Sequence, residues 1–455
     1  MTPAPAVQAN TLLSGAAVYL VANVVNAAIP FALLPLLTRV LGPEGYGEVA
    51  MFQTLLCALE SMVGLSVAGA AGRKYYDGDG ACAQRELASF IGACLQLVLC
   101  SSVLMLGLIQ LLREPLAAAL GLRPQWMSWA VFACACSAVM GIRLGQWQVR
   151  HQARCFGALQ VSQGLLNMAL SLLLVVGLEQ GAEGRVAAQV GVTGLFALLA
   201  LALLRRDALL RLLVWRPDHL KDALAFGLPL VPHFSGLFLL NAVDRVVIHT
   251  ELGLAAAGVY MVAVQVANGM SLVFDAINKA YGPWLFERLR RNDAAEKRRI
   301  VRLTYAWFVL VLLGAALALE LGPPLVGWLA GPEFAHAGAL IGWLALGQAF
   351  NGMYYMVNNY VFYSRRTGAL ALVTVASGLV NVALLLVLVK PLGLQGAAMA
   401  FGLSMGLRFA LTWWVAQRRC PMPWFGVGLL RQAGQLAAAP YKMRANRRRS
   451  GAARN

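Results

Sequence analysis

The chain has 455 residues, of which 60% are hydrophobic and 13% are charged, and its formal net charge is +17. This apolar content exceeds what a soluble core can hide, so the composition excludes a soluble globular protein. Most apolar runs reach about 20 residues, enough for an α-helix to cross roughly 30 Å of hydrocarbon, and they lack the alternation of barrel strands. The sequence therefore predicts an all-α polytopic membrane protein.

Twelve transmembrane helices are predicted in chain order. They fall near residues 11–38, 48–72, 87–112, 126–147, 156–177, 185–204, 223–250, 257–281, 303–321, 337–363, 368–389 and 395–417. No Lys or Arg precedes Arg39, so we expect no cleavable signal segment before the first helix. The internal segments 205–222 and 282–302 are charged, and no extramembranous domain is expected.

The basic residues indicate the orientation of these helices. With a cytoplasmic N-terminus, 30 of the 37 Lys and Arg residues lie on the cytoplasmic side and six on the other, with Arg408 inside the last span. This asymmetry predicts a multi-pass protein of the cell (inner) membrane with both termini cytoplasmic. It also explains the net charge through anchoring near membrane lipids, so no nucleic acid partner is expected.

Two internal similarities indicate a duplication. The turn Leu41–Gly47 returns as Leu252–Gly258, 211 residues later, and Gly164–Leu170 returns as Gly378–Leu384, 214 residues later. Six helices per copy is an even number, so the two six-helix lobes should be related by a pseudo-two-fold axis along the membrane normal. The expected organisation is an N-terminus (1–10), a first lobe (11–204), a linker (205–222), a second lobe (223–417) and a basic tail (418–455).

Four short motifs carry a family resemblance. They are Leu41–Gly47, Pro232-His233 followed by Asp244–Ile248, Gly258–Tyr260, and Gly393–Ala398. Together they resemble the Wzx-type polysaccharide flippases of the MOP exporter superfamily, over residues 11–417. The resemblance implies two MATE-like lobes in a V shape, alternating access, and passage of an undecaprenyl-pyrophosphate-linked oligosaccharide to the outer leaflet. The same superfamily contains multidrug exporters, so a multidrug or small-molecule antiporter is the alternative.

Two predicted helices carry polar rows. In the eighth, Gln265, Asn268, Asp275 and Lys279 share one face, which suits a water-filled path for the head group. An ion pair between Asp275 and Lys279 is the alternative explanation. In the tenth, amides and one aromatic ring suit sugar hydroxyls, although interhelical hydrogen bonding explains them equally well. This second row consists of Gln348, Asn351, Tyr355 and Asn358.

Three arginines are candidate stations for pyrophosphate, because the guanidinium fork matches phosphate oxygens. Arg245 lies in the seventh helix and Arg408 in the twelfth, and Arg39 lies near the outer end of the first. Snorkelling to the interface is the alternative for Arg39. Prolines in the first and seventh helices, including Pro30 and Pro229, should bend those helices, and a packing role is the alternative.

The chain has no Gly-x-x-x-x-Gly-Lys-Ser/Thr loop for a nucleotide, so we expect coupling to an ion gradient of H⁺ or Na⁺. Candidate coupling residues are Glu60, Asp244, Asp275 and His233. Neither a cofactor nor a metal is expected, and the acidic and histidine residues show no catalytic spacing, so an enzyme is disfavoured. Other polysaccharide-assembly proteins are candidate partners.

Overall fold

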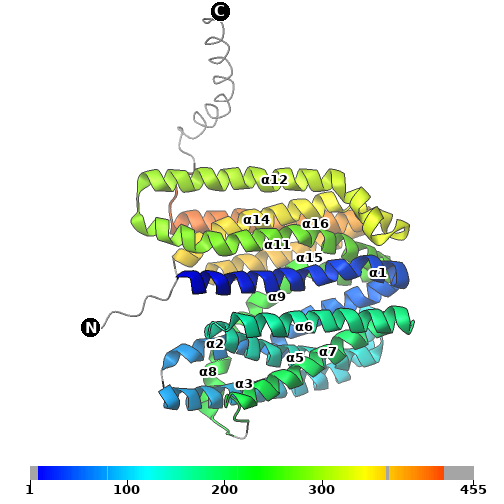
Figure 1. Cartoon of the computed structure of the whole chain (residues 1–455). Coiled ribbons are helices and arrows are strands. Elements are labelled where there is room, and N and C mark those ends of the chain that lie inside the picture. The colour runs from blue at the N-terminus through cyan, green and yellow to red at the C-terminus, as the bar shows by residue number, and fades with distance from the viewer. Residues whose placement is uncertain (1–8, 79, 213, 365–367, 425–455) are drawn as a thin grey trace, which may run out of the picture.

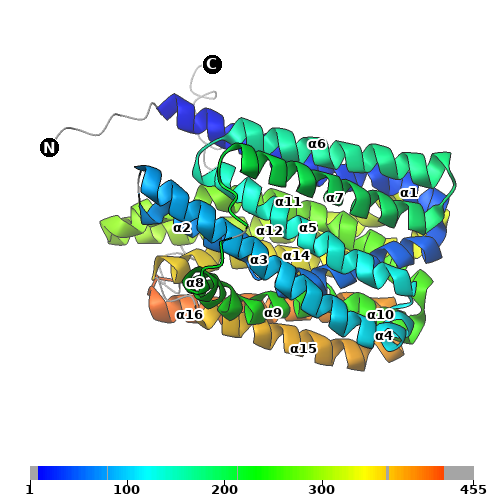
Figure 2. The same cartoon turned by 90° about the horizontal axis from the view of Figure 1, so that it is seen from below.

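The computed structural model describes residues 9–78, 80–212, 214–364 and 368–424, and within these ranges the secondary structure is helical. Ten of the described helices are long and apolar enough to cross a membrane. The long helices run side by side along one direction (Figures 1 and 2). The chain is therefore an all-α, multi-pass membrane protein, as predicted.

The first half of the chain forms seven α-helices. They are α1 (Ala9–Gly64), α2 (Val67–Lys74), α3 (Gly80–Leu111), α4 (Arg113–Leu120), α5 (Pro124–Val149), α6 (Ala153–Leu172) and α7 (Gly181–Arg206). Helix α6 continues as a π-helical turn at Leu173–Gly177. In Figure 1 the helices α2 to α7 lie together in the lower part of the molecule.

The second half forms the remaining described helices. They are α8 (Pro217–Gly227), α9 (Val231–Asn241), α10 (Val243–Leu252), α11 (Leu254–Arg291), α12 (Ala294–Ala330), α13 (Ala335–Gly338), α14 (Ile341–Tyr363), α15 (Gly368–Leu392) and α16 (Leu394–Arg419). Helices α11, α12, α14, α15 and α16 occupy the upper part of Figure 1. The predicted tail 418–455 is described only to Trp424.

The prediction of twelve spans differs from the ten apolar helices in two places. Helix α1 counts once, although non-helical backbone at Gly42 (φ 64°, ψ −179°) separates its two parts where the sequence predicts a turn. Helix α14 is not among the ten, because its amide side chains lower its hydropathy. The number twelve stays a prediction.

Several predicted boundaries are wrong. The charged segment 282–302 is not a loop, because α11 runs to Arg291 and α12 begins at Ala294. The predicted helix 223–250 is broken by a 3₁₀ turn at Leu228–Leu230, which contains Pro229, and again at Ala242. The predicted helix 48–72 breaks at Leu65 and Ser66, whose φ angles are 43° and 52°. The break at Leu65 and Ser66 is held by a tertiary contact with Gly227, described below.

The two repeated turns pack against each other. A Cβ atom added at Gly47 would lie 2.1 Å from the Leu254 carbonyl oxygen, and one added at Gly258 would lie 2.0 Å from the Pro43 carbonyl oxygen. These contacts are reciprocal, because the 211-residue offset relates Pro43 to Leu254 and Gly47 to Gly258. Such self-complementary packing is what a two-fold axis between two repeats produces. We call this end of the bundle the joined end.

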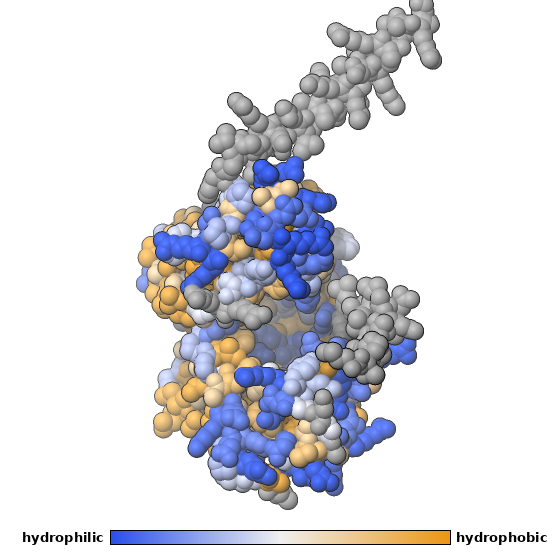
Figure 3. Space-filling model, turned by 90° about the vertical axis from the view of Figure 1, so that its left-hand side faces the viewer, coloured by the Kyte–Doolittle hydropathy of each residue, from blue (hydrophilic) through white to orange (hydrophobic). Residues whose placement is uncertain are grey.

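The opposite end, which we call the open end, carries Lys74, Arg206 and Arg291 at the ends of α2, α7 and α11. Figure 3 views the molecule from this end and shows a surface hollowed between two halves with hydrophilic rims. The largest buried apolar cluster includes residues of both halves, among them Tyr46 and Tyr260. The halves thus share a core near the joined end and part toward the open end.

We predict that Gly47→Ala and Gly258→Ala each lower the free energy of unfolding by about 1–3 kcal/mol, because the added methyl group collides with a backbone carbonyl. Unfolding of the purified protein in detergent measures the change. The control is Gly191→Ala in α7, where an added Cβ meets nothing within 4 Å. Equal stability of all three variants would contradict the reciprocal packing.

Candidate functional site

The polar rows of α11 and α14 lie against each other. Gln348 Nε2 donates to Asn268 Oδ1 at 2.8 Å, and Asn351 Nδ2 lies 3.4 Å from Ser271 Oγ. One helical turn or more farther on, Asn359 Nδ2 donates to Asn278 Oδ1 at 2.8 Å. The predicted amides therefore hold two helices together, which is the alternative that the sequence left open. Their role in binding sugar stays a prediction.

Two other members of the α14 row are not held in this way. Asn358 is buried, and its Oδ1 atom has no hydrogen-bond partner among the described residues. Tyr355 is half-buried, and its ring lies 5.9 Å from that of Tyr354. An unsatisfied buried amide oxygen keeps its capacity to accept a hydrogen bond.

A compact buried cluster surrounds Asp244 in α10. Tyr260 Oη donates to Asp244 Oδ2 at 2.8 Å, and the Arg245 backbone amide donates to Oδ1 at 2.9 Å. Arg245 Nη1 lies 3.8 Å from the same carboxylate and donates to the Asn241 carbonyl at 2.8 Å. Asp244 is only 2% exposed, so its charge depends on these donors.

A small cavity of about 50 Å³ adjoins this carboxylate. Its polar lining consists of Asn241, Asp244, Asn268 and Gln348, and Phe401 is among its apolar walls. Such a volume holds a water molecule or a small cation. Within the described ranges no group of three or more His, Cys, Asp or Glu side chains is placed to hold a metal ion.

Arg408 of α16 is a buried charge without a carboxylate. It is 7% exposed, and its guanidinium carbon lies 3.8 Å from the centre of the Tyr354 ring. Its Nη1 atom reaches Asn351 Oδ1 at 3.5 Å, and no acidic side chain among the described residues pairs with it. The half-buried His233 of α9 lies close enough to feel its charge. A positive charge without a neutralising partner inside a membrane span is energetically costly unless an anion binds to it.

Other predicted residues lie apart from this cluster. Lys279 Nζ pairs with Asp275 Oδ2 at 2.6 Å, with side chains 58% and 44% exposed. Glu60 is exposed within α1, and no hydrogen bond or ion pair to its side chain is found among the described residues. Because a charged group facing lipid is costly, we expect these three side chains to face water.

Arg39 and Gln265 belong to contacts between the halves. Gln265 Nε2 donates to the Pro30 carbonyl at 2.6 Å, and Tyr46 Oη donates to Gln265 Oε1 at 2.8 Å. Arg39 Nη2 reaches the Trp328 carbonyl at 3.4 Å in an exposed position. These bonds tie α1 to α11 and α12, so both residues help to join the halves.

Sequence reasoning did not name Arg185 as a site residue, although the predicted helix 185–204 begins at it. The structure places it in α7, where Nη1 donates to Asn167 Oδ1 at 3.1 Å and to Ser171 Oγ at 3.0 Å. A signal was present, because Asn167 belongs to the repeated segment Gly164–Leu170. Arg185 therefore supplies a half-buried cation in the first half, held by neutral partners.

The chain matches known proteins over most of its length. A family model described as polysaccharide biosynthesis protein matches residues 12–289. A Haemophilus influenzae protein named for the Lsg locus is 24% identical over 384 residues, which are 82% of this chain and 90% of that protein. A membrane protein of the same organism is 25% identical over 374 residues, covering 81% and 88% of the two chains.

Solved structures show the same fold. An inward-facing multidrug resistance transporter of the MATE family and MOP superfamily has a TM-score of 0.64, with 17% identity over 87% of this chain and 94% of that one. The lipid II flippase MurJ, in an inward closed conformation, has a TM-score of 0.64, with 12% identity over 86% of each chain. The predicted MOP-like fold is thus confirmed.

We predict that Tyr260→Phe lowers the free energy of unfolding by about 1–3 kcal/mol, because the buried Asp244 carboxylate loses its 2.8 Å donor. Denaturation in detergent measures the loss. Tyr363→Phe is the matched control, since this ring is 39% exposed. A loss no larger than that of the control would show that Asp244 does not depend on the tyrosine.

Proposed function

Because the chain belongs to the polysaccharide biosynthesis protein family, we propose that it is a flippase for a polyprenyl-linked oligosaccharide. The substrate is an oligosaccharide on undecaprenyl pyrophosphate, which moves from the cytoplasmic to the outer leaflet of the cell membrane. Family and fold neighbours support a membrane flippase or transporter in place of an enzyme. The substrate and the coupling ion are our inference.

The single observation that carries the proposal is the uncompensated Arg408. Its positive charge is buried in a span, and among the described residues its guanidinium contacts Tyr354 and the Asn351 oxygen. Such a site attracts an anion and repels a cation. A pyrophosphate that carries two or more negative charges through the membrane interior suits this charge, and Asn358 and Tyr355 of the neighbouring α14 suit the attached sugar hydroxyls.

The path follows from the arrangement of the halves. The hollow at the open end admits the head group between the two lobes, 11–204 and 223–417, while the joined end is closed by the packing of Gly47 and Gly258. Rocking of the lobes closes the open end and separates the joined end, which exposes the same cations to the other side. Arg245 and Lys279 then guide the pyrophosphate, with Arg39 at the outer exit.

Energy for transport comes from an ion gradient in this proposal. Asp244 has the small polar cavity beside it, so H⁺ or Na⁺ is able to reach its carboxylate and change the hydrogen bonds to Tyr260 and Arg245. Glu60 and Asp275, whose side chains are at least partly exposed, are further candidates, and His233 of α9 is another. Protonation of a carboxylate during rocking is the coupling step.

The orientation is part of the proposal. The open end carries most of the described basic residues, such as Arg206 and Arg291, and both ends of the described chain lie there (Figure 1). The positive-inside rule makes this end cytoplasmic, with both termini inside the cell. Other polysaccharide-assembly proteins are the expected partners in handing over the substrate.

The alternative is an antiporter of drugs or other small molecules, which the multidrug transporter of the same fold favours. The buried Arg408 argues against a cationic drug. The two functions differ in what accumulates when the protein is lost.

We predict that deletion of the protein leaves lipid-linked oligosaccharide on the cytoplasmic leaflet, measured by its accessibility to an added glycosidase in inside-out vesicles. We expect this accumulation to be at least tenfold. A complementing Arg408→Gln copy should fail to relieve it, because the positive charge that binds the pyrophosphate is lost. An Arg205→Gln copy, altered at an exposed residue, is the control and should restore export. Drug accumulation with normal glycan export would instead support the antiporter.

We predict that Asp244→Asn and Glu60→Gln each reduce flipping at least tenfold while the protein stays folded, because neither amide titrates. Flipping is measured in proteoliposomes with an imposed pH or Na⁺ gradient, and folding by size-exclusion chromatography. Normal gradient-driven flipping by both variants would contradict coupling through these acids.

A further inference from the structure

Helix α8 spans the end of the predicted linker (205–222) and the start of the predicted second lobe (223–417), and it docks on the first half. His219 Nε2 lies 3.1 Å from Glu86 Oε2 of α3, and the His219 ring packs on Phe90. At the end of α8, a Cβ added to Gly227 would lie 2.0 Å from the Leu65 carbonyl oxygen. Gly227 therefore sits against the break between α1 and α2, and only a glycine fits there.

The next helix packs on the other half. Asn381 Nδ2 of α15 donates to the Leu239 carbonyl of α9 at 2.9 Å, and a Cβ added to Gly378 would lie 2.9 Å from the Gly236 carbonyl. The 3₁₀ turn Leu228–Leu230 between α8 and α9 is thus the link between two bodies. Any movement of the halves acts on this turn.

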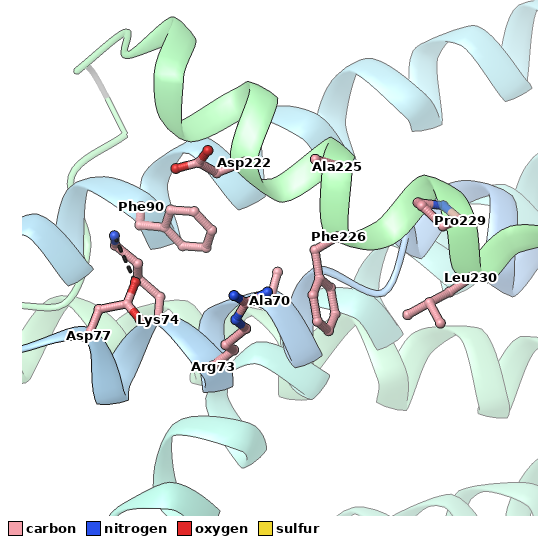
Figure 4. Close-up of a pocket in the computed structure, with 10 residues that line it drawn as sticks. All are labelled: Ala70, Arg73, Lys74, Asp77, Phe90, Asp222, Ala225, Phe226, Pro229 and Leu230. Carbon is pink, nitrogen blue, oxygen red and sulfur yellow. Dashed lines mark ion pairs between the residues drawn. The ribbon is translucent and has the colours of Figure 1, made fainter. Parts of the chain in front are cut away.

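A pocket of about 500 Å³ opens beside this link, at the open end (Figure 4). One wall is α8 with the following turn, and the other is α2 with the short turn after it. Its lining includes Arg73, Lys74 and Asp77 on one wall and Asp222 and Phe226 on the other. This volume suits a phosphorylated sugar.

Some charged side chains in the pocket form an ion pair, and others have no partner among the described residues. Lys74 Nζ pairs with Asp77 Oδ2 at 3.1 Å, so these two neutralise each other. Arg73 and Asp222 face the same space from opposite walls (Figure 4), and neither side chain has an ion pair or hydrogen bond among the described residues. Within the described part of the chain, one unpaired cation and one unpaired carboxylate therefore stand on opposite sides of the pocket.

The aromatic side chains complete the pocket. The Phe226 ring lies beside Arg73 in Figure 4, and it packs on α2, because a Cβ added to Gly69 would lie 3.1 Å from it. Phe90 forms another part of the lining. An aromatic face packs against the apolar C–H face of a sugar ring, while carboxylates accept hydrogen bonds from its hydroxyls.

We propose that this pocket binds a phosphorylated carbohydrate head group before it enters the hollow between the halves. Arg73 holds the phosphate, Asp222 accepts hydrogen bonds from sugar hydroxyls, and Phe226 packs on the ring. A bare phosphate offers no hydroxyl group to Asp222, and a neutral sugar offers no negative charge to Arg73, so the pair favours a ligand with both groups. This inference rests on the proposed function and adds a loading site outside the central cluster.

Occupancy also acts on the link between the halves. The ligand would touch α2 through Arg73 and α8 through Asp222, on either side of the contact between Gly227 and Leu65. A bound head group therefore braces α8 on the first half. The residues that bind the head group would therefore also affect the rocking movement of the lobes.

The test measures protection of a cysteine placed in the pocket. Ala225→Cys puts a thiol on the exposed lining of α8, and its reaction with a maleimide is followed peptide by peptide by mass spectrometry. The exposed Cys155 of α6, which is not in the lining, is the internal reference. The full chain is held in phosphatidylcholine nanodiscs.

Farnesyl pyrophosphate linked to galactose should slow labelling of Ala225→Cys at least threefold. In the Ala225→Cys protein, the additional substitution Arg73→Gln should abolish the protection. The additional substitution Asp222→Asn should reduce the protection to the level that farnesyl pyrophosphate without a sugar gives. Arg85→Gln, which removes an exposed cation outside the lining, should leave the protection intact. Protection by galactose 1-phosphate to the same extent would assign the site to free sugar phosphates of the same chemistry.

Unchanged labelling with every phosphorylated probe, or protection that survives Arg73→Gln, would overturn the inference. Equal protection by phosphatidylglycerol nanodiscs alone would also overturn it, since the pocket would then bind phospholipid. Flipping by the wild-type protein is measured separately in proteoliposomes. If the protein flips its substrate but the probe does not protect the cysteine, only the proposed loading site is rejected. If the probe protects the cysteine but the protein does not flip the substrate, the proposed function is rejected and the binding site stands.

Discussion

The close approach of Gly47 and Gly258 to the opposite turn is the contact on which the rest of the structure depends. Each glycine lets a carbonyl from the other repeat come nearer than any side chain would permit. Because the two contacts are reciprocal, the halves meet back to back around one axis at the joined end. The open end is then free to part, which leaves a hollow there (Figure 3).

The halves share an axis but differ in chemistry. The second half holds Asp244, Arg245 and Arg408 in its buried interior, where amides of α11 and α14 bond to each other and Asn351 contacts Arg408. The first half holds Arg185 on neutral partners and exposes Glu60. In a membrane each of these groups needs a partner or water. Polar networks in the second half also fix how α11 and α14 pack.

The two halves of the molecule are not alike in every part, because two helices are broken at positions where the other repeat has no break. The break at Leu65 and Ser66 receives Gly227, so α8 crosses to the first half, while α9 stays with the second. The corresponding helix of the first repeat, α1, continues without such a link through Pro30 and Pro35. The 3₁₀ turn Leu228–Leu230 therefore connects α8 to α9, and it lies beside the pocket that Arg73 and Asp222 line.

The sequence by itself determined the membrane class, the helical fold, the repeat and the family resemblance, because these depend on hydropathy, on local turns and on residues spaced along one chain. It also placed Gly42 and the 211-residue offset correctly. Only the tertiary structure decided which polar groups meet. Tyr260 on Asp244, Tyr354 on Arg408 and Gly227 on Leu65 are contacts between separate helices. No periodicity encodes them, because a helical pattern gives the face of a residue but not the neighbour that covers it.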